Sequence, residues 1–213
     1  MQSIEESSEI QIHLEVTAPH LDQSAIHVDY FSDEGYGQND IEGIEYQYAF
    51  SPLTEKESFS TYYEKCGGMM VTGRKKVDNT LVSLSSHYDP HKILWMFPDN
   101  FQTSLNNNLI HVRSECVAGS IDVVLFGGCY AISKNKVLQS YASNYIIMTI
   151  SVADQIEKVL DITPRIVAPK FIPQTHNNAY FFPDKQALVI TFPEMTFPEK
   201  KILSVDEIKT WKS

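Results

Sequence analysis

The chain of 213 residues contains few cysteines, and this excludes a fold held together by disulfides. The three cysteines stand at positions 66, 116 and 129, an odd number with wide spacing. Small secreted domains that depend on disulfides carry more cysteines, in even numbers. We therefore expect synthesis in a reducing cytoplasm, where each thiol stays free.

Basic residues are also scarce relative to acidic ones. Lys and Arg together number 17 against 27 Asp and Glu, which gives a formal net charge of -10. Binding to a phosphate backbone or to an anionic membrane surface requires clustered cations. We expect neither nucleic acid nor a membrane as a partner.

Long apolar runs are missing too. No stretch approaches the roughly 18 apolar residues that cross a bilayer. The N-terminal "MQSIEESSEIQIHLEV" carries Glu5, Glu6 and Glu9 where a secretory signal would carry Lys or Arg. The sequence also lacks a phosphate-binding loop, a dinucleotide fingerprint, HExxH and GxSxG. We expect no signal peptide and no membrane span.

What the chain does contain is apolar alternation typical of strands, together with two stretches of helical periodicity. The predicted strands cover residues 9–16, 25–31, 44–50, 68–72, 80–87, 120–126, 165–172 and 186–192. The predicted helices run from residue 100 to Gly119 and from 137 to 160, and Ser204 and Glu207 form a capping box for a short last helix.

The fold class that follows from these elements is α+β. We expect a mixed β-sandwich-like sheet core, flanked by two main helices and a short C-terminal helix. A chain of this length is sufficient for one domain, residues 1–213.

The first candidate for chemistry is Cys66, within "SFSTYYEKCGGMMVTG". A free cysteine is often a buried apolar side chain, and only a thiol deprotonated by a neighbouring base is a nucleophile. Gly67 and Gly68 follow it directly, and glycine allows backbone N–H groups to approach a reacting centre. No apolar strand pattern runs through "YYEKC". These features favour a nucleophile at Cys66.

The candidate base is His87, which ends the second arm of the predicted hairpin in "SLSSHYDP". A strand that runs back alongside residues 66–72 can bring this imidazole within hydrogen-bond reach of the thiol. The alternative is a histidine exposed at a turn. His91 follows four residues later, but Pro90 disfavours the helical register that would align two metal ligands, so we expect no metal site.

Cys129, in "LFGGCYA", is the competing nucleophile because it follows a buried strand and two glycines. No histidine follows Cys129 until His176, so a base close along the chain is lacking. We therefore favour a packing role for Cys129. Cys116 lies on the apolar face of a predicted helix and is expected in the core. Surface or satisfied positions are expected for the scattered histidines, His13, His20, His27 and His111.

Three pieces of the sequence, in this order, resemble the cysteine glutamine deamidases. This superfamily includes the chemoreceptor deamidase of bacterial chemotaxis and the catalytic domain of necrotizing-factor and lethal-factor toxins, such as the Burkholderia lethal factor. The first piece, "STYYEKCGG", is similar to the toxin's Thr-Tyr-Tyr segment, which leads into a Ser-Gly-Cys nucleophile. The second, "LSSHYDP", is a strand that ends in a histidine one hairpin later.

The third piece is similar to the chemotaxis enzyme. It comprises "FPDN", an amphipathic helix and "IDVVLFGGC", followed by "SNYIIMTISVADQIEKVL" and "NAYFFPDKQALVI". The resemblance covers about residues 44–192, which would form the catalytic core, with the strands of residues 1–50 as an N-terminal extension. Two features differ from the family: the cysteine and histidine are 21 residues apart, and Glu64-Lys65 replaces the Ser-Gly pair.

The resemblance implies a protein-glutamine deamidase with Cys66 as nucleophile and His87 as base. Thr61 would orient the imidazole, with Ser60 as the alternative third residue, since Ser60 has the family's spacing to the cysteine. Backbone N–H groups at Gly67 and Gly68 would stabilise the oxyanion. The reaction would pass through a thioester, release ammonia and need no cofactor.

The resemblance also implies a setting for this hydrolase. The expected partner is a protein that presents a glutamine side chain, and we expect the enzyme to be a monomer. It would be made in a bacterial cytoplasm. The strands before Tyr46 favour a toxin or virulence effector, delivered into a host cell by a specialised secretion system, over a chemotaxis enzyme.

Two other interpretations of the same residues stay open. The Cys66–His87 pair could serve a cysteine protease or amidase, or a transglutaminase if an amine replaces water. The chain could also be a non-catalytic binding module that has kept the fold, in which case Cys66 would be inert.

Overall fold

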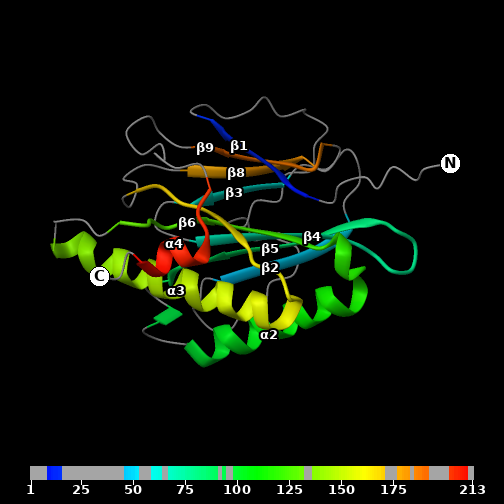
Figure 1. The fold of residues 1–213 in the computed structure, drawn as a ribbon, viewed down its shortest axis with the longest axis horizontal. Coiled ribbons are helices and arrows are strands. Elements are labelled where there is room, and N and C mark those ends of the chain that lie inside the picture. Colours follow the sequence, from blue (N-terminus) through cyan, green and yellow to red (C-terminus); the bar gives the residue numbers. More distant parts are fainter. Residues whose placement is uncertain are drawn as a thin grey trace.

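Two stacked sheets and a layer of helices make up the protein in this computed structural model. The structure describes residues 9–15, 46–52, 59–63, 67–90, 93–94, 98–131, 136–170, 177–182, 185–191 and 202–210. In Figure 1 the smaller sheet lies on top, the larger sheet lies in the middle, and the long helices cover the outer face of the larger sheet. The predicted α+β class with a sandwich-like core is confirmed.

The middle layer is a five-stranded sheet with the order β2-β5-β4-β6-β7. Its strands are β2 (Tyr46–Pro52), β4 (Gly67–Arg74), β5 (Leu81–Tyr88), β6 (Asp122–Gly127) and β7 (Arg165–Val167). β4 is central and antiparallel to both β5 and β6, whereas β7 is parallel to β6. The predicted hairpin after Cys66 is therefore confirmed as β4–β5.

The outer layer is a four-stranded sheet with the order β1-β9-β8-β3. Its strands are β1 (Gln11–Glu15), β9 (Ala187–Thr191), β8 (Asn177–Phe182) and β3 (Phe59–Tyr63). The sequence does not predict β3, because "FSTYY" has no apolar alternation, and β3 forms by pairing with the distant β8. The predicted strand at 25–31 lies outside the described residues.

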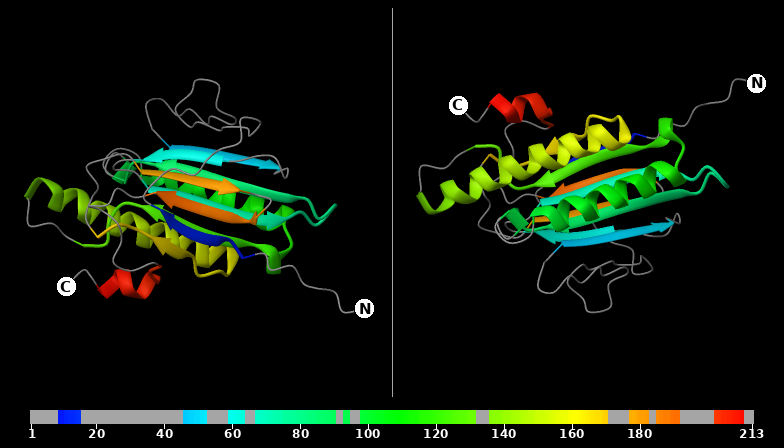
Figure 2. Two further views of the ribbon diagram at one scale, coloured as in Figure 1. Left: turned by 90° about the horizontal axis from the view of Figure 1, so that it is seen from above. Right: turned by 90° about the horizontal axis from the view of Figure 1, so that it is seen from below.

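The helical layer contains α2 (Pro98–Glu115) and α3 (Lys136–Leu160), with the short α4 (Val205–Thr210) beside α3. Seen from below, α2 and α3 lie side by side across the five-stranded sheet (Figure 2). The predicted capping box of α4 is confirmed, since the Ser204 N–H donates to Glu207 Oε2 at 2.9 Å and the Glu207 N–H donates to Ser204 Oγ at 3.2 Å.

The end of α2 differs from the prediction. The helix stops at Glu115, and Gly119 lies in the following 3₁₀ turn η1 (Ala118–Ser120). The chain leaves the helix where its backbone pairs with the β4–β5 turn: the Lys76 N–H donates to the Glu115 carbonyl, and the Val117 N–H donates to the Arg74 carbonyl. Tertiary hydrogen bonds to the hairpin, rather than a glycine cap, thus end the helix.

The alternation of β4 divides the buried residues into two cores. Met69 and Val71 point to the helices, where they join the larger apolar cluster. Met70 points the other way, into the cluster between the two sheets, together with Phe126 and Phe181. Both faces of β4 are therefore buried, as expected for a central strand.

A charged cluster ties β1 to the five-stranded sheet. Asp122 Oδ2 accepts hydrogen bonds from the Ile10 N–H at 2.6 Å and from the guanidinium of Arg165. Arg165 also pairs with Glu9 at 3.1 Å. Ile10 is fully buried between the sheets. The N-terminal strand is thus an integral part of the sandwich.

Candidate active site

The segment that carries Cys66 links the two sheets. Residues 64–66 lie outside the described residues, but they connect the end of β3 in one sheet to the start of β4 in the other. A connection this short keeps the α-carbons of Tyr63 and Gly67 within roughly 14 Å. Because stacked sheets lie about 10 Å apart, the connection crosses from sheet to sheet at one end of the sandwich.

Gly67 and Gly68 are the first two residues of β4, and each allows an aromatic ring to pack against the backbone. A Cβ on Gly67 would overlap the ring of Tyr88 on the helix side of the sheet. A Cβ on Gly68 would overlap the ring of Phe126 on the side that faces the other sheet. The glycine pair therefore has a packing role of its own, and its presence is not by itself a sign of a nucleophile.

His87 lies in β5, directly opposite Gly68 in the β4–β5 ladder and opposite Gln47 on the other side. Its side chain lies outside what the structure describes. On the far side of Gly68, the same row of the sheet continues to Phe126. Position 87 thus shares a face of the sheet with Gly68 and Phe126, the face that points toward the four-stranded sheet.

The two candidates for the third residue lie next to each other in β3, and their register separates them. Thr61 pairs with Ala179 of β8, whereas Ser60 pairs with Tyr180. Ala179 belongs to the cluster between the sheets, and Tyr180 does not. Residues directly opposite in an antiparallel pair share a face, so position 61 occupies the inner face and position 60 the outer face.

The other two cysteines are packed in the protein interior. Cys129 is 4% exposed and packs with Ala142 and Tyr145, and burial raises the pKa of its thiol to about 12. Cys116 is fully buried, and burial likewise raises the pKa of its thiol. The predicted packing roles of both are confirmed, and neither thiol is set up as a nucleophile.

The scattered histidines form no site in the part of the chain that the structure describes. His13 and His111 are exposed, whereas His20, His27, His91 and His176 lie outside the described residues. No group of three or more His, Cys, Asp or Glu residues gathers there in a way that could hold a metal ion. None of the described helices is long and apolar enough to span a bilayer.

One neighbour of the site could not be found by inspecting the sequence around the cysteine. Phe126 ends the buried strand in "VVLFGG", far along the chain from Cys66, yet its ring covers Gly68. Gly127, which follows it, pairs with Gly67 and has a φ of 92°. The available signal is the aromatic-Gly-Gly end of a buried strand, which matters only once β6 is known to lie beside β4.

Comparison with known proteins does not add a family. No protein-family model matches the chain, and no curated protein matches it.

Proposed function

We propose that the protein is a cysteine-dependent protein-glutamine deamidase with Cys66 as nucleophile and His87 as base. The observation that carries this proposal is the β4–β5 register, in which His87 faces Gly68, two residues after Cys66. Alternate residues of a strand share a face. If β4 continued by one residue, Cys66 would therefore stand diagonal to His87.

This diagonal relation suits a catalytic pair. Side chains at diagonal positions of neighbouring antiparallel strands have Cβ atoms about 7–8 Å apart or less. A thiol and an imidazole that lean toward one another over this separation reach hydrogen-bond distance. The ring of Phe126, which covers Gly68 on this face of the sheet, would border the pair.

The register of β3 supports Thr61 rather than Ser60 as the third residue. Position 61 occupies the inner face of its sheet, opposite the face that carries position 87. The short β3–β4 connection keeps the end of β3 near Cys66. A hydroxyl at position 61 could hold the imidazole of His87 in the tautomer that accepts the thiol proton, as the third group of a triad does.

The proposed reaction replaces an amide nitrogen by oxygen. His87 takes the Cys66 proton, and the thiolate attacks the carboxamide carbon of a substrate glutamine. A backbone N–H near Cys66 or Gly67 donates to the oxyanion. The imidazolium then protonates the leaving nitrogen, which departs as ammonia and leaves a thioester. Water, deprotonated by His87, hydrolyses the thioester to glutamate and restores the thiol.

The segments on which the resemblance rests form regular elements in the fold. The helix α2, the buried β6, the long α3 and the β8–β9 hairpin follow one another along the chain. A protein with an exposed glutamine is proposed as the substrate on the ground of the resemblance. The proposal of a host protein as that substrate rests on the predicted strands before Tyr46, which favour the toxin arrangement over the chemotaxis enzyme.

The proposal is tested by following glutamine-to-glutamate conversion in a mixture of folded eukaryotic proteins. Mass spectrometry should detect shifts of about one dalton and a matching release of ammonia. Cys66→Ser should abolish both, and His87→Ala should slow them about 10²–10⁴-fold. Cys129→Ser is the matched control and should leave the rate unchanged.

Detection of a different product in this test would assign a different function. New peptide termini that depend on Cys66 would show a protease, and incorporation of a primary amine would show a transglutaminase. The packing role of Gly67 and Gly68 favours the remaining alternative, a non-catalytic binding module, because it explains the glycines without chemistry. In a binding module of this kind, the Cys66 thiol would show the reactivity of an unactivated cysteine.

A further inference from the structure

The β4–β5 hairpin and the end of α2 form one continuous surface at the end of the molecule opposite the proposed active site. The hairpin extends beyond the sheets at the right of Figure 1. Its Lys76 N–H donates to the Glu115 carbonyl at 2.8 Å, and the Val117 N–H donates to the Arg74 carbonyl at 2.9 Å. We name this surface the hairpin patch; it comprises Lys75, Lys76, Val77, Ile110, Arg113 and Val117.

The hairpin patch gathers much of the exposed apolar surface. Among the described residues, five large apolar side chains are exposed, and three of them lie here: Val77 at 88%, Ile110 at 50% and Val117 at 45%. Val117 lies beside the hairpin through its bond to Arg74, and Ile110 lies one helical turn before Ser114, which accepts from Lys76. Exposed aliphatic residues grouped in this way are typical of an interaction surface. Packing within the chain does not explain Val77, which stands at the tip of the turn.

The same surface is cationic on an acidic protein. Residues 74–79 and 110–119 carry four Lys and Arg against two carboxylates, whereas the chain as a whole has a net charge of -10. In the part of the chain that the structure describes, no carboxylate lies within ion-pair distance of Lys75, Lys76 or Arg113. Lys75 acts electrostatically on Asp78 of the same turn. With four cations against two carboxylates, the surface keeps an excess of two positive charges for a partner.

Two of these cations are held in place by neutral acceptors. Lys76 Nζ donates to the carbonyl oxygens of Arg113 at 3.0 Å and Ser114 at 2.8 Å. Arg113 donates to the carbonyl of Val159 at 2.9 Å. The carbonyls of Arg113 and Ser114 lie at the C-terminal end of α2, and that of Val159 lies at the C-terminal end of α3. A cation at the C-terminal end of a helix is stabilised by the helix dipole. Fixed charges lose less conformational entropy when a partner binds.

We propose that the hairpin patch is a docking surface for an acidic segment of a partner protein, one that carries Asp or Glu around aliphatic side chains. Carboxylates would meet the fixed cations, and the aliphatic side chains would cover Val77, Ile110 and Val117. Charge complementarity selects this partner over an anionic bilayer, because the remainder of the acidic chain would be repelled from an extended negative surface.

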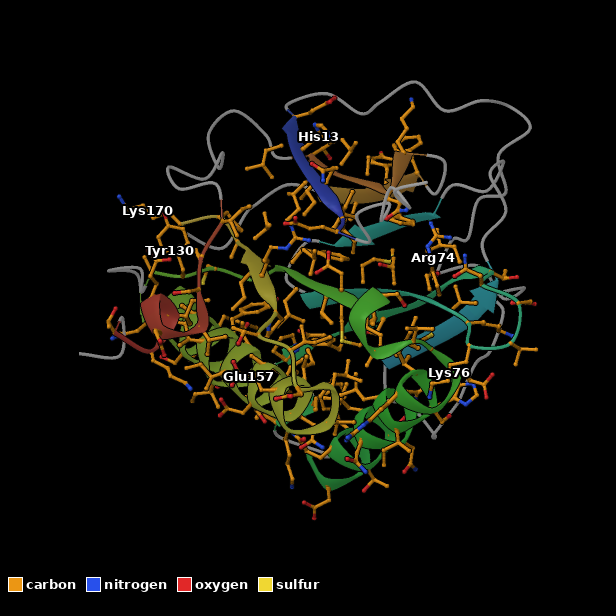
Figure 3. All side chains as sticks on the ribbon, turned by 45° about the vertical axis from the view of Figure 1, so that its right-hand side comes forward. His13, Arg74, Lys76, Tyr130, Glu157 and Lys170 are labelled. Carbon is orange, nitrogen blue, oxygen red and sulfur yellow. The ribbon has the colours of Figure 1, made fainter. Side chains whose placement is uncertain are left out.

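The docking surface is separate from the proposed thiol chemistry. β4 spans eight residues between Gly67 and the hairpin turn, which corresponds to roughly 23 Å. Figure 3 shows Arg74 and Lys76 at one end of the molecule, and Tyr130 and Lys170, which follow β6 and β7, at the other. Docking can therefore be tested without reference to Cys66.

The test is an NMR titration of the full chain with synthetic peptides. The first peptide alternates Glu and Leu, the second replaces each Leu by Ser, and the third replaces each Glu by Lys. We expect the first to shift amide signals of residues 74–79 and 110–119, and the other two to bind about tenfold more weakly or not at all. Added salt should weaken the first complex.

Variants locate the contact. Val77→Ser and Lys75→Glu should each weaken binding of the first peptide about tenfold. Val77 is almost fully exposed, so its replacement leaves the fold intact. Ile147→Ser and Lys185→Glu, which change an exposed aliphatic residue and an exposed lysine elsewhere, are the matched controls and should bind normally.

Three outcomes would overturn the proposal. One is the absence of shifts at residues 74–79 and 110–119 with the first peptide. Another is equal binding of the Ser-containing peptide, which would reduce the site to non-specific charge attraction. The third is retention on phosphatidylserine vesicles that Val77→Ser abolishes, which would make the hairpin patch a membrane contact.

Discussion

At the residue scale, two adjacent glycines at the start of the central strand β4 contact aromatic rings on opposite faces of the sheet. The ring of Tyr88 packs on Gly67 from the helix side, and the ring of Phe126 packs on Gly68 from the sheet side. Side chains at these positions would push both rings away and open the two cores at the end of the sandwich where Cys66 is attached. The stability and the proposed chemistry thus depend on the same backbone segment.

Replacing Gly68 should destabilise the fold through overpacking. The new Cβ of Gly68→Ala would overlap the Phe126 ring, which is itself buried, so we expect a loss of about 1–3 kcal/mol in the free energy of unfolding. Urea denaturation of both proteins measures this difference. Gly119→Ala is the control, because a Cβ there meets no atom within 4 Å. Equal effects of the two substitutions would contradict the packing role.

The register of β3 predicts different effects for substitutions at its two adjacent hydroxyl residues, Ser60 and Thr61. Position 61 lies on the inner face and position 60 on the outer face of the sheet. We expect Thr61→Ala to slow deamidation and to alter its pH profile, because the imidazole of His87 loses its orienting partner. Ser60→Ala should leave rate and pH profile unchanged. A larger loss with Ser60→Ala would assign the third role to Ser60.

The buried thiols should be inert in the folded protein. Burial raises the pKa of Cys129 to about 12, so only about one molecule in ten thousand carries the thiolate at pH 8. Iodoacetamide at this pH should leave Cys129 and Cys116 unmodified until urea is added, as peptide mass spectrometry can show. Rapid alkylation of Cys129 without denaturant would mean that its pocket opens readily.

At the element scale, the charged cluster around Asp122 joins elements from both sheets. Its carboxylate accepts the Ile10 N–H, beside β1, and the guanidinium of Arg165 in β7. Ile10 is fully buried, so loss of the Asp122 carboxylate leaves its N–H without an acceptor and with little access to water. Arg165 would keep only its pair with Glu9. β1 lies at the edge of its sheet and pairs there with β9, so this cluster contributes directly to its attachment.

We therefore expect Asp122→Ala to loosen the N-terminal strand. The free energy of unfolding should fall by about 1–3 kcal/mol, and the Ile10 amide should exchange its hydrogen faster. Asp154→Ala is the matched control, because Asp154 pairs with Lys209 on the surface and such pairs contribute about 0–1 kcal/mol. Unchanged exchange at Ile10 in Asp122→Ala would show that β9 alone holds β1.

The elements that the sequence predicts best are those with strong local periodicity. The β4–β5 hairpin and α3 lie close to their predicted bounds, because alternating and helical patterns follow directly from burial of one face. β3 is missed because its pairing with β8 is a long-range contact. The end of α2 is misplaced because hydrogen bonds to the hairpin turn stop it before Gly119.

At the scale of the whole molecule, the sandwich separates the proposed active site from the proposed docking surface. The end where β3 passes into β4 carries the segment with Cys66, and the opposite end carries the hairpin patch. The sequence is sufficient to propose the pair Cys66 and His87, because both flank one hairpin. It does not reveal the register that sets His87 opposite Gly68, nor the exposure that defines the hairpin patch, since both arise only when distant strands and helices pack together.

Activation of Cys66 by His87 can be tested through the pH dependence of Cys66 alkylation. Iodoacetamide reactivity of Cys66, followed by peptide mass spectrometry from acid to alkaline pH, reports its thiolate. We predict a thiolate that titrates well below the ordinary cysteine pKa of about 8.5, and a loss of this reactivity in His87→Ala. A thiol that titrates at or above the ordinary value, and that reacts equally with and without His87, would contradict it.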